Sequence, residues 1–185
     1  MSMRVVFLKG DYTGRDKTRQ LQAKLKGVNF VISFHFNSAS NPKAQGAEVY
    51  YNFRTKKCIA DAVMDAIVGV LNNPKRIVRE ATKTRASFIN YYHCPAILIE
   101  PCFISNKHEA EMIHDVETLR KLGESIAQTL RRFLPKEVTV GLDIGHKFKE
   151  MSPYDKGAKC VLGDWEADHN ERLAKVVAAS LKAMK

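Results

Sequence analysis

The most constraining feature of this sequence is an apolar run from Val28 to Phe36 that ends in polar residues. Its β-branched and aromatic residues are typical of a strand buried on both faces, at the centre of a parallel or mixed sheet. His35 and Asn37 lie two residues apart at its carboxyl end, so their side chains point to the same side. Open α/β sheets bind ligands at such strand ends. The sequence therefore predicts a ligand site here, with a core histidine bonded to a backbone carbonyl as the alternative.

Apolar runs alternate with amphipathic segments along the rest of the chain. Strands are expected at residues 4–8, 47–51, 95–100 and 138–144, and helices at about 15–26, 56–71 and 119–133 and from Asp164 onward. Asp164 is expected to cap the last helix, and Ser105 or Asn106 a short helix. Strands interleaved with helices indicate an α/β fold, a three-layer sandwich around a twisted, mixed but mostly parallel sheet. The length and the lack of repeats predict a single domain over residues 1–185.

The chain is basic, with 30 Lys and Arg against 20 Asp and Glu and a net charge of +10. This charge favours a polyanionic partner, such as nucleic acid, an anionic wall polymer or an acidic membrane surface. Residues 72–85 are expected to be irregular, as a solvated charge run or a substrate-facing patch. No apolar run is long enough for membrane insertion, and the stretch before Lys9 is too short for a signal peptide. Synthesis in the cytoplasm is therefore expected.

Four residues able to bind a metal or transfer a proton stand at the ends of predicted elements. Three of them follow or end buried strands, namely His35, Glu100 and His146, and Glu166 opens the last helix. If the strands run parallel, all four groups can converge at one edge of the sheet. Two imidazoles, one carboxylate and an open position describe a hydrolytic zinc site. A further carboxylate that does not bind the metal would serve as general base and proton shuttle.

Several segments resemble the zinc-dependent N-acetylmuramoyl-L-alanine amidases of the amidase-3 type, which cleave peptidoglycan. The segment S-F-H-F-N-S resembles that family's S-I-H-x-N block, and Q-G-A-E-V-Y-Y resembles its G-x-E-x-Y-Y strand. The segment A-I-L-I-E-P-C-F-I-S-N resembles a block ending L-x-E-x-x-F-x-S-N. Finally L-D-I-G-H, K-G-A and W-E-A-D-H-N resemble the family's opening segment.

The resemblance implies a role for each matched residue. His35, His146 and Glu166 match ligands of a zinc ion (Zn²⁺), and Glu100 matches the catalytic glutamate. Hydrogen bonds to the ligands or to the substrate are expected from Asn37, Asn170 and Asp143. His169 is an alternative ligand, because Glu-x-x-His is itself a metal-binding spacing. Cys102 is either a nucleophile or a buried thiol, and His93, His108 and His114 are expected at the surface or in structural positions.

The matched blocks stand in a different order from the family's, since the G-H and E-x-x-x-N blocks come last here. The resemblance therefore implies a circularly permuted amidase, with Leu134 to Glu137 joining the family's usual ends and Met1 close to Lys185. The expected setting is a phage endolysin, made in the host cytoplasm and acting on the cell wall in the periplasm after release. A monomer without nucleic-acid binding is expected. The alternatives are another zinc hydrolase on a related fold, such as a peptidase, or a basic nucleic-acid-binding module.

Overall fold

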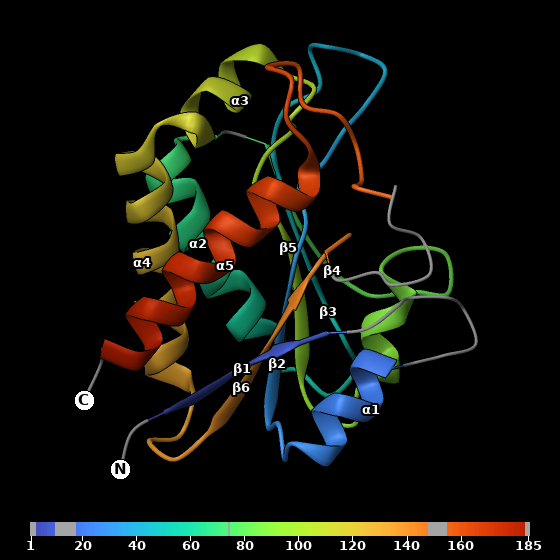
Figure 1. Cartoon of the computed structure of the whole chain (residues 1–185), viewed down its shortest axis with the longest axis vertical. Coiled ribbons are helices and arrows are strands. Elements are labelled where there is room, and N and C mark those ends of the chain that lie inside the picture. Colours follow the sequence, from blue (N-terminus) through green and yellow to red (C-terminus); the bar gives the residue numbers. More distant parts are fainter. Residues whose placement is uncertain (1–2, 10–17, 74, 148–154, 184–185) are drawn as a thin grey trace.

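A computed structural model of the chain describes residues 3–9, 18–73, 75–147 and 155–183, in which strands alternate with helices (Figure 1). The strands are β1 Arg4–Leu8, β2 Phe30–Phe34, β3 Ala47–Tyr51, β4 Arg76–Glu80, β5 Ala96–Glu100 and β6 Thr139–Ile144. The helices are α1 Thr18–Leu25, α2 Lys57–Leu71, the 3-10 helix η1 Ser87–Tyr91, α3 Lys107–His114, α4 Val116–Phe133 and α5 Glu166–Ala183. Each predicted strand and helix is present, and β4 and η1 are additions to the predicted set.

The strands form one sheet with the order β1-β6-β2-β5-β3-β4. Strands β1, β6, β2 and β5 run parallel, β3 runs antiparallel to β5, and β4 pairs parallel with β3. Phe34 near the end of β2 pairs with Ile99 of β5 and with Ile144 of β6. The carboxyl ends of these three central strands therefore lie at one edge of the sheet, which confirms the predicted mixed, mostly parallel arrangement.

Helices α2, α4 and α5 cover one face of the sheet, and α1 with η1 lies over the other (Figure 1). The central strand β2 is buried on both faces, as predicted. Phe30, Ile32 and Phe34 pack in the larger core with α2, α4 and α5, whereas Val31 packs in the smaller core with α1 and η1. The three predicted layers are thus present, and the layer formed by α1 and η1 consists of two short helices. Within the described residues, none of the helices combines the length and the apolar character that crossing a membrane requires.

Strand β4 lies in the basic segment that the sequence predicts to be irregular, so that prediction is wrong for residues 76–80. Ile77 and Val78 are partly buried, and the other three residues are exposed. The strand stands at one end of the sheet, where charged side chains hinder pairing with another chain. Because charged residues flank Ile77 and Val78, the apolar pattern is too short to predict this strand from the sequence.

The helix starts agree with the sequence in one case and differ in another. Asn106 caps α3, because its side chain accepts a hydrogen bond of 3.2 Å from the backbone N–H of the third helical residue. The prediction that Asp164 caps the last helix is wrong, since α5 begins at Glu166. Asp164 Oδ1 lies instead 3.1 Å from His114 Nε2 and 3.0 Å from His169 Nε2. Two imidazoles have taken the place of the helix backbone as partners of this carboxylate.

Candidate metal centre

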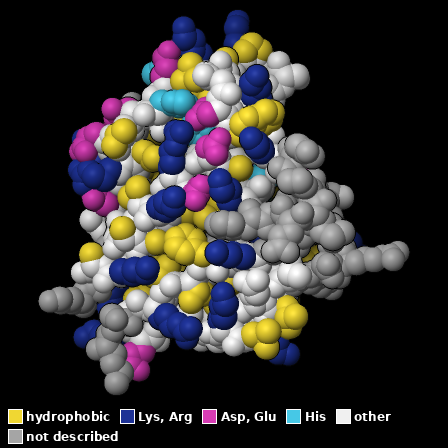
Figure 2. Space-filling model, viewed as in Figure 1, with side chains coloured by type: hydrophobic (Ala, Val, Ile, Leu, Met, Phe, Trp, Pro, Cys, Tyr) yellow, Lys and Arg dark blue, Asp and Glu magenta, His cyan; other side chains and the backbone are white. Residues whose placement is uncertain are grey.

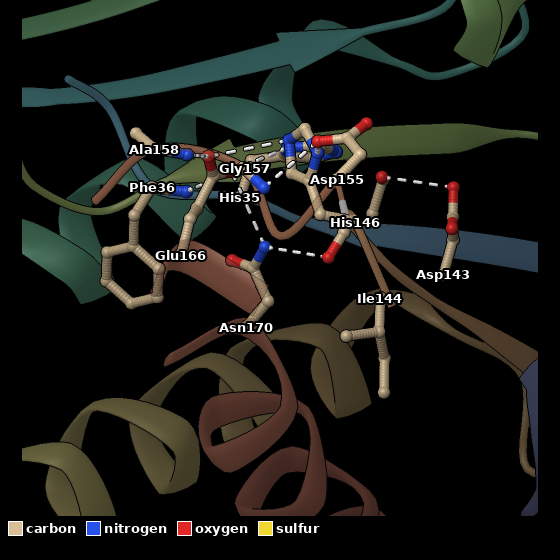
Figure 3. A network of polar contacts seen from close by, with 12 residues as sticks. His35, Phe36, Asp143, Ile144, His146, Asp155, Gly157, Ala158, Glu166 and Asn170 are labelled. Atoms are coloured by element: carbon tan, nitrogen blue, oxygen red, sulfur yellow. Dashed lines mark hydrogen bonds and ion pairs between the residues drawn. The ribbon is translucent and has the colours of Figure 1, made fainter. Parts of the chain in front are cut away.

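The ends of β2 and β6 and the start of α5 bring His35, His146 and Glu166 together (Figure 3). One potential ligand atom of each residue lies within 4.8 Å of those of the other two. His35 Nδ1 is 3.0 Å from Glu166 Oε1, and His146 Nε2 is 3.4 Å from Glu166 Oε2. The carboxylate therefore lies between the two imidazoles, and each imidazole faces a different oxygen.

Glu166 is buried, and several donors surround its carboxylate. The backbone N–H of Phe36 lies 3.4 Å from Oε1, and that of Ala158 lies 3.1 Å from Oε2. Burial disfavours ionisation, but hydrogen bonds with the two imidazoles outweigh it and lower the pKa of Glu166 below its ordinary value. The side chain is consequently an ionised carboxylate, which is the form that binds a metal.

Two glycines give the imidazoles and the carboxylate room to approach. A Cβ at Gly145 would lie 2.6 Å from His35 Nε2. A Cβ at Gly157 would lie 2.5 Å from Glu166 Oε2 and 2.7 Å from His146 Cδ2. Gly157 also has a φ of +76°, which glycine adopts without strain. Any larger residue at either position would push a side chain of the group out of place.

His146 occupies an unusual position in the turn after β6. Its φ is 59°, in the left-handed region that residues other than glycine seldom adopt and that is often found at functional sites. Its Nδ1 lies 3.1 Å from Asp155 Oδ1. A carboxylate on one ring nitrogen orients the imidazole and leaves the other nitrogen for a metal. The arrangement thus directs Nε2 of His146 toward Glu166.

Arg19 of α1, which the sequence pattern does not single out, holds the turn that carries His146. Its guanidinium donates to the carbonyl of Ile144 at 2.9 Å and to that of Lys147, and it forms a buried ion pair with Asp143. Asp143, one of the predicted hydrogen-bonding residues, is therefore linked to the site through Arg19. A single arginine in a polar helix gives no sequence signal of such a role.

The two predicted asparagines lie beside the group in different ways. Asn170 Nδ2 donates to the carbonyl of Gly145 at 3.1 Å and lies 3.5 Å from Glu166 Oε1, so it connects two parts of the site. The backbone of Asn37 pairs with the segment after β5. Its side-chain Nδ2 is buried and has no hydrogen-bond partner among the described residues. A buried donor of this kind is available to a ligand.

Glu100 at the end of β5 lies in a pocket of about 520 Å³ that His35 and Asn37 also line. Arg85 and Phe88 stand on another part of its wall. Burial raises the pKa of Glu100 to about 7, and the electrostatic effect of the nearby His35 imidazole opposes this rise in part. A carboxyl group that titrates near neutral pH can both accept and return a proton, so it suits a general base.

The alternative residues lie elsewhere. His169 forms a separate group with His114, Cys160 and Asp164 and does not join the three residues described above. Cys102 is buried, and burial raises the pKa of its thiol well above the ordinary value. A protonated thiol out of contact with solvent is a poor nucleophile. These properties favour the buried thiol over the nucleophile at Cys102.

The chain is similar to known proteins in sequence and in fold. The family model described as N-acetylmuramoyl-L-alanine amidase (Amidase_3) matches residues 3–132. The chain is similar to the solved catalytic domain of the amidase CwlV from Bacillus (Paenibacillus) polymyxa var. colistinus, with a TM-score of 0.57 and 23% identity over 63% of this chain and 64% of that chain. It is also similar to AmiC2 of Nostoc punctiforme, with a TM-score of 0.55 and 24% identity over 62% of this chain and 63% of that chain. A third similar structure is an N-acetylmuramoyl-L-alanine amidase from Clostridium difficile 630, with a TM-score of 0.56 and 24% identity over 65% of this chain and 64% of that chain. No curated protein sequence gives a match.

At these identities the likeness to solved structures shows the fold. The chain spans slightly less than two thirds of the length of these three structures. The residues matched by the family model include His35 and Glu100, whereas His146 and Glu166 lie beyond them. The match still covers well over half of the chain. The chain therefore belongs to the N-acetylmuramoyl-L-alanine amidase family Amidase_3.

Proposed function

We propose that the protein is a zinc-dependent amidase with one catalytic domain. Its reaction is hydrolysis of the bond between the lactyl group of N-acetylmuramic acid and L-alanine in peptidoglycan. The observation that carries this proposal is the family match over residues 3–132, which contain the pocket residues His35 and Glu100. The similar solved structures are amidases by their names, and their fold is shared by this chain.

The chemistry of His35, His146 and Glu166 fits a zinc ion. Two imidazole nitrogens and one carboxylate oxygen are ordinary zinc ligands, and three protein ligands leave a coordination position open. Their proximity, the ionised state of Glu166 and the contact of His146 with Asp155 all support this role. When bound there, zinc supplies a Lewis acid that polarises the scissile carbonyl and lowers the pKa of bound water to about 7.

Glu100 serves as the general base and acid of the proposed reaction. It accepts a proton from the attacking water and hands it to the amine of the leaving L-alanine. Its pKa of about 7 suits both transfers near neutral pH. Asn37 Nδ2, a buried donor at the same pocket, is placed to donate to an oxygen of the substrate. Asn170 keeps Glu166 and the backbone of Gly145 in their positions.

The charge of the chain fits an anionic wall polymer as substrate. The net charge is +10, and Figure 2 shows Lys and Arg side chains spread over one face of the molecule. Arg85 adds a cation on the pocket wall, where it can pair with a carboxylate of the wall peptide. The net positive charge also fits the alternative of a nucleic-acid-binding module. A mobility shift of nucleic acid that disappears at moderate salt would indicate nonspecific electrostatic attraction.

Metal analysis combined with a wall-hydrolysis assay tests the proposal. Alanine at His35, His146 or Glu166 should each cost one equivalent of zinc and abolish the clearing of a cell-wall suspension. His93→Ala is the matched control, because His93 is exposed. Full zinc occupancy in His146→Ala would remove that residue from the ligand set. Release of amino acids from free peptides without clearing of the wall would favour the peptidase rival.

We also propose that the chain is circularly permuted relative to its family. The family match ends at residue 132, before His146 and Glu166, and about a third of each compared chain is outside the alignment with the solved structures. Helix α5 is in contact with β1, and in Figure 1 the end of α5 lies at the same end of the molecule as the start of β1. Met1 and Lys185 themselves are outside the described residues.

A rearranged chain tests the permutation. Residues 136–185 are moved to the front, and Lys185 is joined to Met1 through a short glycine linker. Because β1 runs parallel to β6, its first residue lies at the edge of the sheet away from His146, so the new junction is far from the ligands. The rearranged protein should fold, bind zinc with similar affinity and hydrolyse the wall. A folded product that does not bind zinc would contradict the proposal.

The setting of the enzyme stays a prediction. We propose a phage lysin that is made in the host cytoplasm and reaches the wall in the periplasm after release. We also propose that it is a monomer that does not bind nucleic acid. Sedimentation equilibrium tests the monomer, since a concentration-dependent rise in mass would contradict it. Lysis timed to expression of a holin-type membrane protein would support the phage setting, and lysis without it would not.

A further inference from the structure

A second group of metal-binding side chains lies where α3 ends and α5 begins. It consists of His114, Cys160, Asp164 and His169, and one ligand atom of each lies within 4.8 Å of the ligand atoms of the others. His114 is the last residue of α3, the next two come from the loop before α5, and His169 lies in the first turn of α5. Three segments of the chain therefore meet at one point.

The separations between these atoms approach those of a tetrahedral zinc site. Asp164 Oδ1 is 3.1 Å from His114 Nε2 and 3.0 Å from His169 Nε2. Cys160 Sγ is 3.9 Å from His114 Nε2. Zinc bonds of about 2.0 Å to nitrogen or oxygen and about 2.3 Å to sulfur place such ligands about 3.3 Å apart, or about 3.6 Å when sulfur is one of them. These three distances differ from those values by about 0.3 Å or less, and the ligand atoms of the other pairs lie within 4.8 Å of each other.

The backbone already holds the loop that supplies two of the ligands. The N–H of Cys160 donates to the carbonyl of Asp164 at 2.8 Å, and the N–H of Gly163 donates to the carbonyl of Cys160 at 3.0 Å. Gly163 has a φ of +111°, which favours glycine and closes the turn. The N–H of Val161 donates to the carbonyl of Ile104 at 3.0 Å. A metal would therefore bind to a loop that is ordered in advance.

The group is closed on one side and open on the other. Cys160 and His169 are buried, whereas the side chain of His114 is 32% exposed. An ion can thus reach the group past His114. Arg172 NH1 lies 3.4 Å from Asp164 Oδ2, so the arginine pairs with one oxygen of this carboxylate and leaves Oδ1 to the two imidazoles.

We propose that these four residues bind a second metal ion of the zinc class, in a structural role. Thiolate and imidazole ligands suit zinc, and four protein ligands close the coordination sphere as in structural sites. Cys160 binds as the thiolate, and its proton leaves to solvent. The ion ties the end of α3 to the first turn of α5 and to Asp164, which lies two residues before Glu166, and so fixes the helix that carries the Glu166 carboxylate. The proposal does not depend on the amidase activity.

The competing account is a hydrogen-bonded cluster without a metal. In that account Asp164 accepts hydrogen bonds from both imidazoles, and Cys160 stays a thiol. The two accounts differ in the state of the sulfur, because only a bound metal ionises this buried thiol near neutral pH. A measurement that detects a metal–thiolate bond therefore separates them.

Cobalt(II) binding to the full chain is that measurement. The proposed zinc centre has only nitrogen and oxygen ligands, so a thiolate-to-cobalt absorption band in the near ultraviolet reports on the second site alone. Metal-free protein, kept reduced, should bind two cobalt ions and show the band. His35→Ala should lose one ion and keep the band. Cys160→Ser should lose the other ion and the band, whereas Cys58→Ser, at an exposed cysteine of α2, should keep both.

A second variant keeps the test decisive if Cys160→Ser fails to fold. His114→Ala removes a partly exposed ligand at a helix end and should weaken cobalt binding at the second site at least tenfold while the fold is kept. Absence of the band in the wild-type protein, or a band that survives Cys160→Ser, would overturn the proposal. A failed wall assay with the band intact would reject the amidase and leave the second site standing.

Discussion

One methyl group added at Gly145 should disable the proposed zinc centre without unfolding the protein. Gly145 is buried, and a Cβ built there would lie 2.6 Å from His35 Nε2 and 2.7 Å from His35 Nδ1. His35 Cε1 would lie closer still, and ordinary contact begins at 3.4 Å, so the imidazole of His35 must move by about 1 Å. The φ of Gly145 is outside the left-handed region, so this contact is the main effect of Gly145→Ala.

A shift of this size is large for a metal ligand. Metal–ligand distances tolerate deviations of about 0.2 Å. Disturbed support of a ligand costs about 10- to 100-fold in metal affinity, and misplacement by about 1 Å costs about 100-fold in rate. The Gly145→Ala protein should therefore bind zinc about 10 to 100 times more weakly. With zinc in excess, it should hydrolyse the wall about 100 times more slowly.

Zinc affinity is measured by competition with a chromogenic chelator, and the fold is checked by thermal unfolding of the metal-free protein. Gly69→Ala is the matched control, because Gly69 is exposed in α2 and nothing lies within 4 Å of an added Cβ. It should stabilise the helix by up to about 1 kcal/mol and leave zinc binding unchanged. Wild-type zinc affinity in a folded Gly145→Ala protein would refute the placement of His35 against Gly145.

Glu100→Gln should retain zinc while the rate of wall hydrolysis falls by about two to four orders of magnitude, and loss of metal would instead make Glu100 a ligand. In the metal-free protein, the raised pKa of Glu100 means that its neutral form favours the fold at low pH and that this contribution is lost as the pH rises through about 7. Glu100→Gln should therefore match the wild type near pH 4 and exceed its unfolding free energy by roughly 3 kcal/mol near pH 8, and identical urea curves at both pH values would contradict this. Arg19→Met leaves Asp143 buried without its cation and should cost about 3–5 kcal/mol in urea unfolding; adding Asp143→Asn should recover part of the loss.

The strands that carry the site could be predicted from local patterns. The apolar runs of β2 and β5 are short and rich in β-branched residues, and each stands next to a side chain with acid-base or metal chemistry. Which of those side chains meet could not be predicted locally, because His35 and Glu166 are 131 residues apart. The resemblance to a family supplied that pairing, and the structure brings the two residues together.

The features that the sequence does not reveal depend on contacts between distant segments. Arg19 lies 124 residues from Asp143, and no spacing rule relates a polar helix to a distant strand end. The sequence around His114 predicts a surface or structural histidine, and its side chain is partly exposed. Its contact with Asp164 exists because the end of α3 lies beside the loop before α5, and that packing follows from the whole fold. The edge strand β4 is likewise not predicted, because three of its five residues are charged.

The position of β6 in the sheet has a consequence for the growing chain on the ribosome. Strand β6 follows the other described strands in sequence, yet it lies between β1 and β2. Until β6 has been synthesised, the nascent protein holds two unfilled strand edges in its interior and cannot close its larger core. Pairing across such long sequence separations is slow, and open edges attract other chains. Helix α5 with Glu166 follows β6 in sequence, so a nascent chain cannot assemble the proposed zinc centre before α5 has been made.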